Sequence, residues 1–111
     1  MTETLADAAH QDMAALRAHA AEAVALLKVL GNEDRLMLMC QIAQQPRTVG
    51  ELEQLTGISQ PSLSQQLGVL RREALVRTER EGKFIRYQAA DARALRLMAV
   101  VHALFCEGVH A

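Results

Sequence analysis

The chain has 111 residues, half of them apolar, so it is long enough for one globular domain and too apolar to be disordered. Aromatic residues are scarce, so leucine, alanine, methionine and valine must fill the core, which favours helices packed on helices. A net charge of −1 does not by itself indicate nucleic-acid binding. No apolar run approaches the roughly 20 residues of a membrane span, and the first residues lack the apolar segment of a signal peptide. We therefore expect a cytoplasmic protein whose thiols are kept reduced, with no contact to a membrane.

The first part of the chain has the spacing of two amphipathic helices. Over 11–30 apolar residues recur every three or four positions, and they are Met13, Leu16, Ala20, Val24, Leu27 and Leu30. Gly31 interrupts this pattern, and Asn32 can cap a second helix that ends near Pro46. The expected buried stripe of this second helix comprises Leu36, Met39, Cys40 and Ala43. We expect Met37 in the core as well.

Residues 48–73 predict a helix-turn-helix. Thr48 and Glu51 have the spacing of a capping box, which begins a short helix. Gly57 suits the left-handed position that often follows a helix. Ser59 can then cap the next helix, with a proline in the first turn where the backbone N–H groups lack partners. The expected buried stripe of this helix comprises Leu63, Leu67 and Leu70.

The hydrophobic period changes from 3.6 residues to 2 over 75–88, which predicts a β-hairpin around the glycine turn at 81–83. Asp91 can cap a last helix over 91–107. The apolar side of that helix comprises Leu95, Met98, Val101, Leu104 and Phe105. The predicted fold is mainly α with a β-hairpin wing: a winged helix-turn-helix in the order ααααββα that forms a single domain over 1–111.

Charge is unevenly distributed along the chain. Residues 1–34 hold six acidic residues against two basic ones, whereas residues 71–86 hold six basic residues against three acidic ones. The basic segment could be either a solvated charged face or an electrostatic footprint for nucleic acid. In the second interpretation Arg77, Lys83 and Arg86 contact phosphates, which adds affinity and salt dependence without sequence information.

The second helix of the predicted helix-turn-helix has features of a DNA-reading helix. With its leucines turned inward, its other face shows Gln60, Ser62, Ser64 and Gln65 near the N-terminus. Such side chains can donate to and accept from base edges, and recognition helices present their N-terminal residues to the major groove. A polar face alone is also typical of an ordinary solvated helix. The preceding short helix, the glycine turn and the basic hairpin together favour double-stranded DNA as the partner.

Three segments together resemble the ArsR/SmtB family of winged-helix repressors: LKVLGNEDRLMLMCQIA, TVGELEQLTGISQPSLSQQLGVLRREALV and REGKFIRYQAAD. The resemblance covers roughly 24–107, and its most specific part is ELEQLTGISQPSLSQQLGVLR. It implies a homodimer held by the first and last helices, here 11–30 and 91–107. It also places Gln60, Ser64 and Gln65 on base-contacting positions of an operator-binding helix.

Most members of this family sense metals, and one type of family site places several cysteines on the short helix before the turn, where this chain has none. Another type lies on the last helix, where Asp91 matches the first ligand but Arg93 replaces the histidine expected next. His102, Cys106 and His110 are spaced to share a helix face and could bind zinc. We expect no metal cofactor, and a metal-responsive repressor with Cys/His ligands is the alternative.

Cys40 and Cys106 are the only cysteines, and their spacing alone does not separate inert core residues from reactive thiols. The segments RLMLMC and LFC resemble the dithiol subgroup of the family, which senses persulfides and polysulfides. The resemblance implies that reactive sulfur species join the two thiols by a disulfide or a longer bridge and switch off operator binding. Two competing hypotheses are an enzyme in which a cysteine is the nucleophile and His102 the base, and a module that only binds other proteins. We expect a non-enzyme, because no oxyanion element accompanies the thiols.

Overall fold

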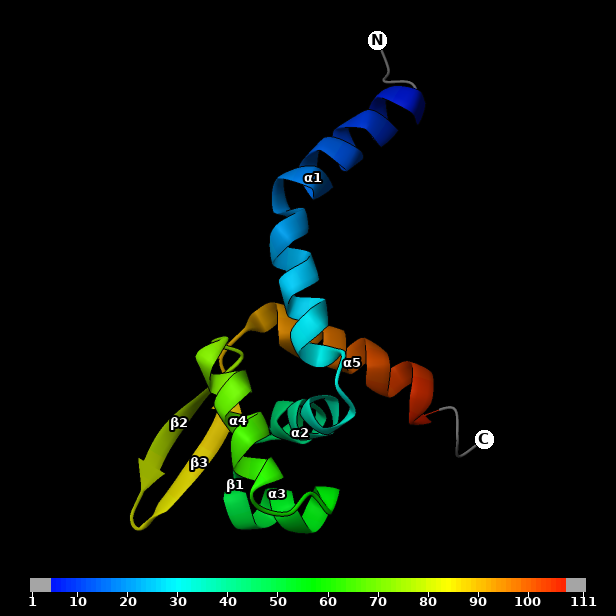
Figure 1. Ribbon diagram of the computed structural model, residues 1–111. Coiled ribbons are helices and arrows are strands. Elements are labelled where there is room, and N and C mark those ends of the chain that lie inside the picture. The colour runs from blue at the N-terminus through cyan, green and yellow to red at the C-terminus, as the bar shows by residue number, and fades with distance from the viewer. Residues whose placement is uncertain (1–4, 108–111) are drawn as a thin grey trace.

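The computed structural model of the protein describes residues 5–107, which form five helices and a three-stranded antiparallel sheet (Figure 1). In chain order the elements are α1 (Leu5–Leu30), α2 (Glu33–Gln44), β1 (Arg47–Thr48), α3 (Val49–Thr56), α4 (Ser62–Arg72), β2 (Val76–Glu81), β3 (Phe84–Ala89) and α5 (Ala92–Phe105). The predicted winged helix-turn-helix is confirmed. The structure adds the short strand β1, which pairs with β3 so that Arg47 lies opposite Tyr87. Two residues are too few to show a strand period, so this strand was not predicted.

The predicted caps of α2, α3 and α5 are present as hydrogen bonds. The Asn32 side chain accepts from the backbone N–H of Arg35 at 3.0 Å. Asp91 accepts from two backbone N–H groups at the start of α5, at 2.8 Å and 3.2 Å. At α3, Thr48 and Glu51 form the reciprocal capping box. These caps satisfy N–H groups that have no partner inside their own helices, so they fix where each helix begins.

The boundaries of two helices differ from the predictions. α1 begins at Leu5 rather than near residue 11, because its first turns continue in helix-forming residues without an apolar stripe. α4 begins at Ser62, and Ser59 does not cap it with its side chain. Instead the Gln60 side-chain oxygen accepts from the backbone N–H of Ser64 at 3.1 Å.

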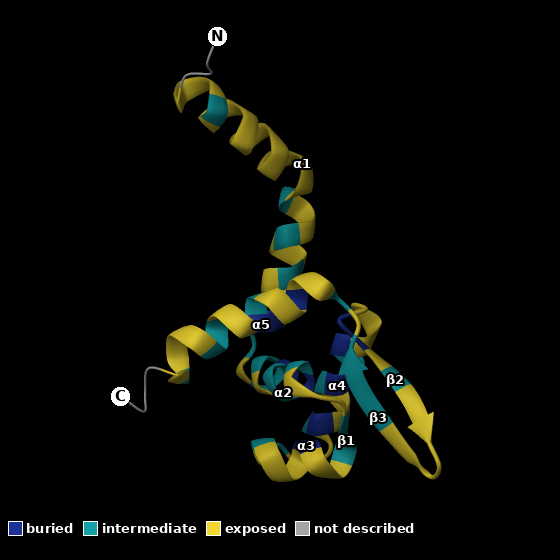
Figure 2. Ribbon diagram, turned by 180° about the vertical axis from the view of Figure 1, so that it is seen from behind, coloured by how far each residue is buried: buried dark blue, intermediate teal, exposed yellow. Residues whose placement is uncertain are grey.

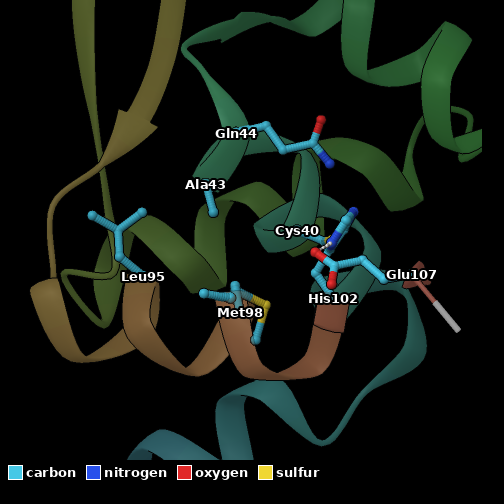
Figure 3. Close-up of a pocket in the computed structure, with 8 residues that line it drawn as sticks. Cys40, Ala43, Gln44, Leu95, Met98, His102 and Glu107 are labelled. Atoms are coloured by element: carbon cyan, nitrogen blue, oxygen red, sulfur yellow. Dashed lines mark ion pairs between the residues drawn. The ribbon is translucent and has the colours of Figure 1, made fainter. Parts of the chain in front are cut away.

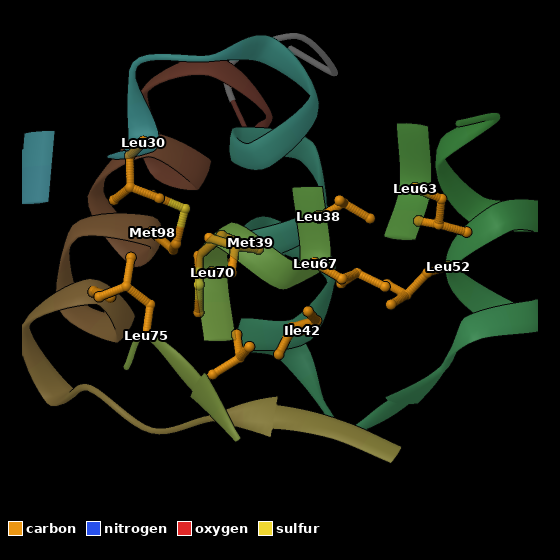
Figure 4. Packing of buried hydrophobic residues seen from close by; sticks show 12 residues of the cluster. Leu30, Leu38, Met39, Ile42, Leu52, Leu63, Leu67, Leu70, Leu75 and Met98 are labelled. Carbon is orange, nitrogen blue, oxygen red and sulfur yellow. The ribbon is translucent and has the colours of Figure 1, made fainter. Parts of the chain in front are cut away.

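The core lies where α2, α4, α5 and the base of the hairpin meet (Figure 4). All three predicted leucines of α4 are buried, and Met98 of α5 packs with them. The buried face of α2 runs through Leu38, Met39 and Ile42, and the expected core position of Met37 is wrong, because its side chain is 49% exposed. Residues 37 and 39 point about 200° apart around a helix, so one α2 face cannot bury both.

The first and last helices leave apolar side chains without cover. In Figure 2 α1 projects from the body as a largely exposed helix, and only its last residue, Leu30, is buried. The exposed apolar side chains of α1 and α5 include Met13, Leu16, Val24, Leu27, Val100, Leu104 and Phe105. Within residues 5–107, none of the helices is both long enough and apolar enough to cross a membrane.

Candidate functional site

The N-terminal half of α4 places the four predicted base-reading residues in different surroundings. Ser64 and Gln65 are exposed on the outer face of the helix. Gln60 is also exposed, and its side-chain oxygen is used in the bond to the Ser64 backbone. Ser62 is half-buried, and its hydroxyl donates to the Asp34 carboxylate on α2 at 3.4 Å. The free protein therefore presents Ser64 and Gln65 outward and turns Ser62 toward its own α2.

The wing carries the three predicted phosphate-contacting residues on β2, β3 and the turn between them. Arg77 and Lys83 are exposed. Arg86 is half-buried, and its guanidinium bonds to Glu81 at 3.0 Å and to Glu51 at 3.3 Å. These ion pairs tie the hairpin to the capped start of α3. Arg86 is therefore already neutralised in the free protein, whereas no ion pair within residues 5–107 involves Arg77 or Lys83.

The predicted thiol pair lies where α2 meets the end of α5. Cys40 and Cys106 are both free and both half-buried. Cys40 lines a pocket of about 270 Å³ whose walls include Ala43 and Gln44 from α2, Met98 and His102 from α5, and Glu107 (Figure 3). The walls are mostly apolar, with polar groups from Gln44, His102 and Glu107. A small solute can therefore approach Cys40 through this opening.

The surroundings of Cys40 disfavour its charged form. Burial raises the pKa of the Cys40 thiol, the charge of Cys106 raises it further, and a hydrogen bond from Gln44 partly offsets both effects. Cys106 caps the end of α5, where its backbone N–H donates to the His102 carbonyl at 2.8 Å. The structure thus brings the two cysteines within electrostatic reach of each other. The role of Gln44 was not predicted, although its place one helical turn after Cys40 could have indicated it.

The candidate metal ligands in the described residues have other partners. Within residues 5–107 no three His, Cys, Asp or Glu side chains are grouped so that they could bind a metal ion. His102 instead pairs with Glu107 at 3.5 Å. The third member of the predicted Cys/His set, His110, lies outside the described residues.

Asp91, the other candidate ligand, has a structural role in the free protein. It caps α5 and pairs with Arg93 at 3.1 Å, and Arg93 also reaches Glu22 of α1 at 3.2 Å. The hydrogen bond from Arg93 is the main cause of the lowered pKa of Asp91. A guanidinium thus occupies the space beside Asp91 and links α1 to α5.

A helix-turn-helix followed by a β-hairpin wing defines the class of winged helix-turn-helix proteins. The model of the arsR family of bacterial regulatory proteins matches residues 32–78. The biofilm growth-associated repressor of Agrobacterium fabrum is 49% identical over 92 residues, which are 83% of this chain and 79% of that protein. The chain belongs to the ArsR family, a family of transcriptional regulators and not of enzymes.

Two solved structures have the same fold. The crystal structure of the transcriptional repressor BigR from Xylella fastidiosa superposes with a TM-score of 0.78 at 44% identity, over 87% of this chain and 96% of that one. Reduced HlyU from Vibrio cholerae superposes with a TM-score of 0.78 at 35% identity, over 83% of this chain and 97% of that one. Both similarities cover a larger share of the chain than residues 32–78.

Proposed function

We propose that this protein is a DNA-binding transcriptional repressor that releases its operator when reactive sulfur species oxidise Cys40 and Cys106. The observation that supports this best is the pair of free thiols, one on α2 beside an open pocket and the other at the end of α5, close enough for Cys106 to affect the pKa of Cys40. The repressor names of the relatives from Agrobacterium fabrum and Xylella fastidiosa agree with the direction of regulation.

DNA binding is supported by α4 and the wing. Exposed Ser64 and Gln65 can exchange hydrogen bonds with base edges in the major groove, and Gln60 lies just before them. Arg77 and Lys83 are exposed and form no ion pair within residues 5–107, so they can bind DNA phosphates. Arg86 can join them by exchanging a carboxylate partner for a phosphate.

The functional unit is a homodimer in this proposal. The exposed apolar residues of α1 and α5 are more than the surface of a soluble monomer usually carries. Pairing with a second copy would bury them. A twofold dimer presents two α4 helices to successive major grooves, about one DNA turn apart. The spacing of the two helices then controls the affinity for the operator.

Oxidation of the thiol pair proceeds by two exchange steps. One cysteine, as its thiolate, attacks the sulfane sulfur of a persulfide, becomes a protein persulfide and releases the remaining thiolate. The other cysteine, also as its thiolate, attacks the inner sulfur of that persulfide, which forms the Cys40–Cys106 disulfide and expels hydrosulfide. The two thiols lose two protons and two electrons, and the electrons reduce the incoming sulfur. A polysulfide can leave additional sulfur atoms in the bridge.

The bridge would fix α2 to α5. Because α5 belongs to the proposed dimer interface and α2 packs against α4, a covalent bond between α2 and α5 changes the placement of the recognition helices. Leu38, Met39 and Ile42 on the other face of α2 belong to the close-packed core that α2 shares with α4, so a movement of α2 is passed on to α4.

DNA binding is tested by selection from a random pool of double-stranded DNA with reduced protein. We expect recovery of a common sequence with twofold symmetry, bound with an affinity that falls steeply as salt rises. Recovery of no common sequence, or an affinity insensitive to salt, would contradict the proposal.

The thiol chemistry is tested by mass spectrometry after treatment with inorganic polysulfide. We expect the wild-type protein to lose two hydrogens or to gain whole sulfur atoms between Cys40 and Cys106. A Cys106→Ser control should show no internal bridge. Unmodified wild-type protein after treatment would contradict this part of the proposal.

A further inference from the structure

Arg35, on the first turn of α2, bonds to two other helices at once. Its Nε donates to the backbone carbonyl of Val29 at 2.6 Å, and its Nη2 lies 3.5 Å from that of Lys28, both near the end of α1. Its Nη1 donates to the side-chain oxygen of Gln66 on α4 at 2.9 Å. Arg35 and Gln66 are both half-buried. One guanidinium therefore joins α1, α2 and α4.

The groups that meet at Arg35 are suited to holding α1, α2 and α4 in a fixed arrangement. The last carbonyls of a helix lack partners within it, and a cation there also faces the negative end of the helix dipole. A guanidinium has five donors in a rigid plane, so it can satisfy those carbonyls and still bond to a third group in a set direction. Lysine has no comparable planar arrangement.

A second bond holds the same face of α4. Asp34, next to Arg35, accepts from Ser62 at 3.4 Å. Ser62 and Gln66 are four residues apart, so they lie one above the other on the side of α4 that faces α2. Ser64 and Gln65 are exposed. Two consecutive residues of α2 thus hold two successive turns of α4 by side-chain bonds.

We propose that Arg35 is a positioning residue for DNA binding, with Gln66 as its structural partner, so that base reading falls to the exposed Ser64 and Gln65. This inference rests on the proposed DNA-binding function. Hydrophobic contacts from the buried leucines select the face of α4 that packs on the core, but they restrain small rotations of the helix less sharply because apolar packing is not directional. Hydrogen bonds to Gln66 and Ser62 are directional and set the angle at which α4 presents its outer face.

The inference is tested with DNA that wild-type protein recovers from a random pool. Arg35→Met keeps the apolar stem and removes all donors, Gln66→Ala removes the acceptor, and Gln65→Ala is the matched control one position away. Each variant is titrated against the recovered sequence and against a set with single base-pair changes, at several salt concentrations. Thermal unfolding curves of all variants are used to choose an assay temperature at which every variant is fully folded.

At that temperature we expect Arg35→Met to bind all sequences about tenfold more weakly, with the same salt slope as wild type because no phosphate contact is lost. Gln66→Ala should weaken binding to all sequences alike, and the double variant should bind no more weakly than Arg35→Met alone. Gln65→Ala should instead relax the preference at one base pair or more.

Several results would overturn the inference. One is wild-type affinity in folded Arg35→Met, which would mean that Arg35 only stabilises the fold. Others are a smaller salt slope in Arg35→Met, or relaxed preference at a single base pair in Gln66→Ala. If Arg35→Met does not fold, Gln66→Ala alone decides between uniform weakening and a base-specific effect. Failure of wild-type protein to retain any sequence is a different result, and it contradicts the proposed function itself.

Discussion

The charge of Cys106, at the end of α5, raises the pKa of Cys40 on α2. The two thiols are distant in the sequence, and the fold brings them within electrostatic reach across the junction of two helices. A bond between them would lock α2, which directly contacts the recognition helix, to α5, whose outer face is uncovered. In the proposed switch, this placement is what lets oxidation of two half-buried thiols act on the recognition helix.

The reactivity of Cys40 should depend on pH in a defined direction. Because burial is the main cause of its raised pKa, Cys40 in a Cys106→Ser variant should still titrate above 9.0, the ordinary value. Only the thiolate reacts, so alkylation by iodoacetamide should accelerate as the pH rises through that point. Gln44→Leu should raise the midpoint further by removing the hydrogen bond that lowers it. A midpoint below 9.0 in the Cys106→Ser protein would contradict this assignment.

Removal of the α5 cap should destabilise the fold. We expect Asp91→Ala to lower the free energy of unfolding by about 1 kcal/mol at pH 7, measured by urea denaturation. Asp91→Asn should lose less, because asparagine keeps the cap acceptor and gives up only the ion pair with Arg93. Equal losses in the two variants would contradict a role for the cap.

The same carboxylate predicts a pH dependence. The folded protein lowers the pKa of Asp91 below 3.8, so its contribution to stability is present above pH 3.8 and disappears as the pH falls through the lowered value. The stability difference between wild type and Asp91→Asn should therefore shrink in acid. A difference that grows below pH 3.8 would have the wrong sign.

The wing cations should differ in their effect on salt dependence. Arg77→Ala and Lys83→Ala should each reduce the slope of log affinity against log salt by about 0.9, the value for one lost phosphate contact. Arg86→Ala should reduce it less, because Arg86 is paired with Glu51 and Glu81 in the free protein. Titrations at four salt concentrations would measure these slopes. A larger effect from Arg86 than from Arg77 would contradict this ranking.

The uncovered apolar faces of α1 and α5 predict a dimer that charge can break. Leu27→Glu and Val100→Glu place a carboxylate on those faces and should give a monomer in sedimentation equilibrium at micromolar concentration. Leu55→Glu is the control, because Leu55 is similarly exposed but lies on α3. Dimeric Leu27→Glu and Val100→Glu proteins would place the interface elsewhere.

Local signals in the sequence were sufficient for much of this fold. The caps at Asn32, Thr48 and Asp91 depend on residues three or fewer positions apart, and the leucine stripe of α4 depends on helical spacing. Both patterns can be read without knowledge of the rest of the chain.

Features that depend on long-range packing were not predicted. The exposed side of α2 that holds Met37, and the pairing of β1 with β3, follow from how distant elements meet. The bond from Arg35 to Gln66 likewise joins residues 31 positions apart. For the thiol pair, spacing was uninformative and only the resemblance to the dithiol subgroup indicated it.

The most direct test compares the DNA affinity of reduced and polysulfide-treated protein in fluorescence anisotropy titrations at one fixed salt concentration. We predict that treated wild-type protein binds the selected sequence at least tenfold more weakly and recovers on addition of reductant. Cys40→Ser and Cys106→Ser proteins should bind equally well before and after treatment. Equal affinity of reduced and treated wild-type protein, or a full response in either serine variant, would contradict a switch made by these two cysteines.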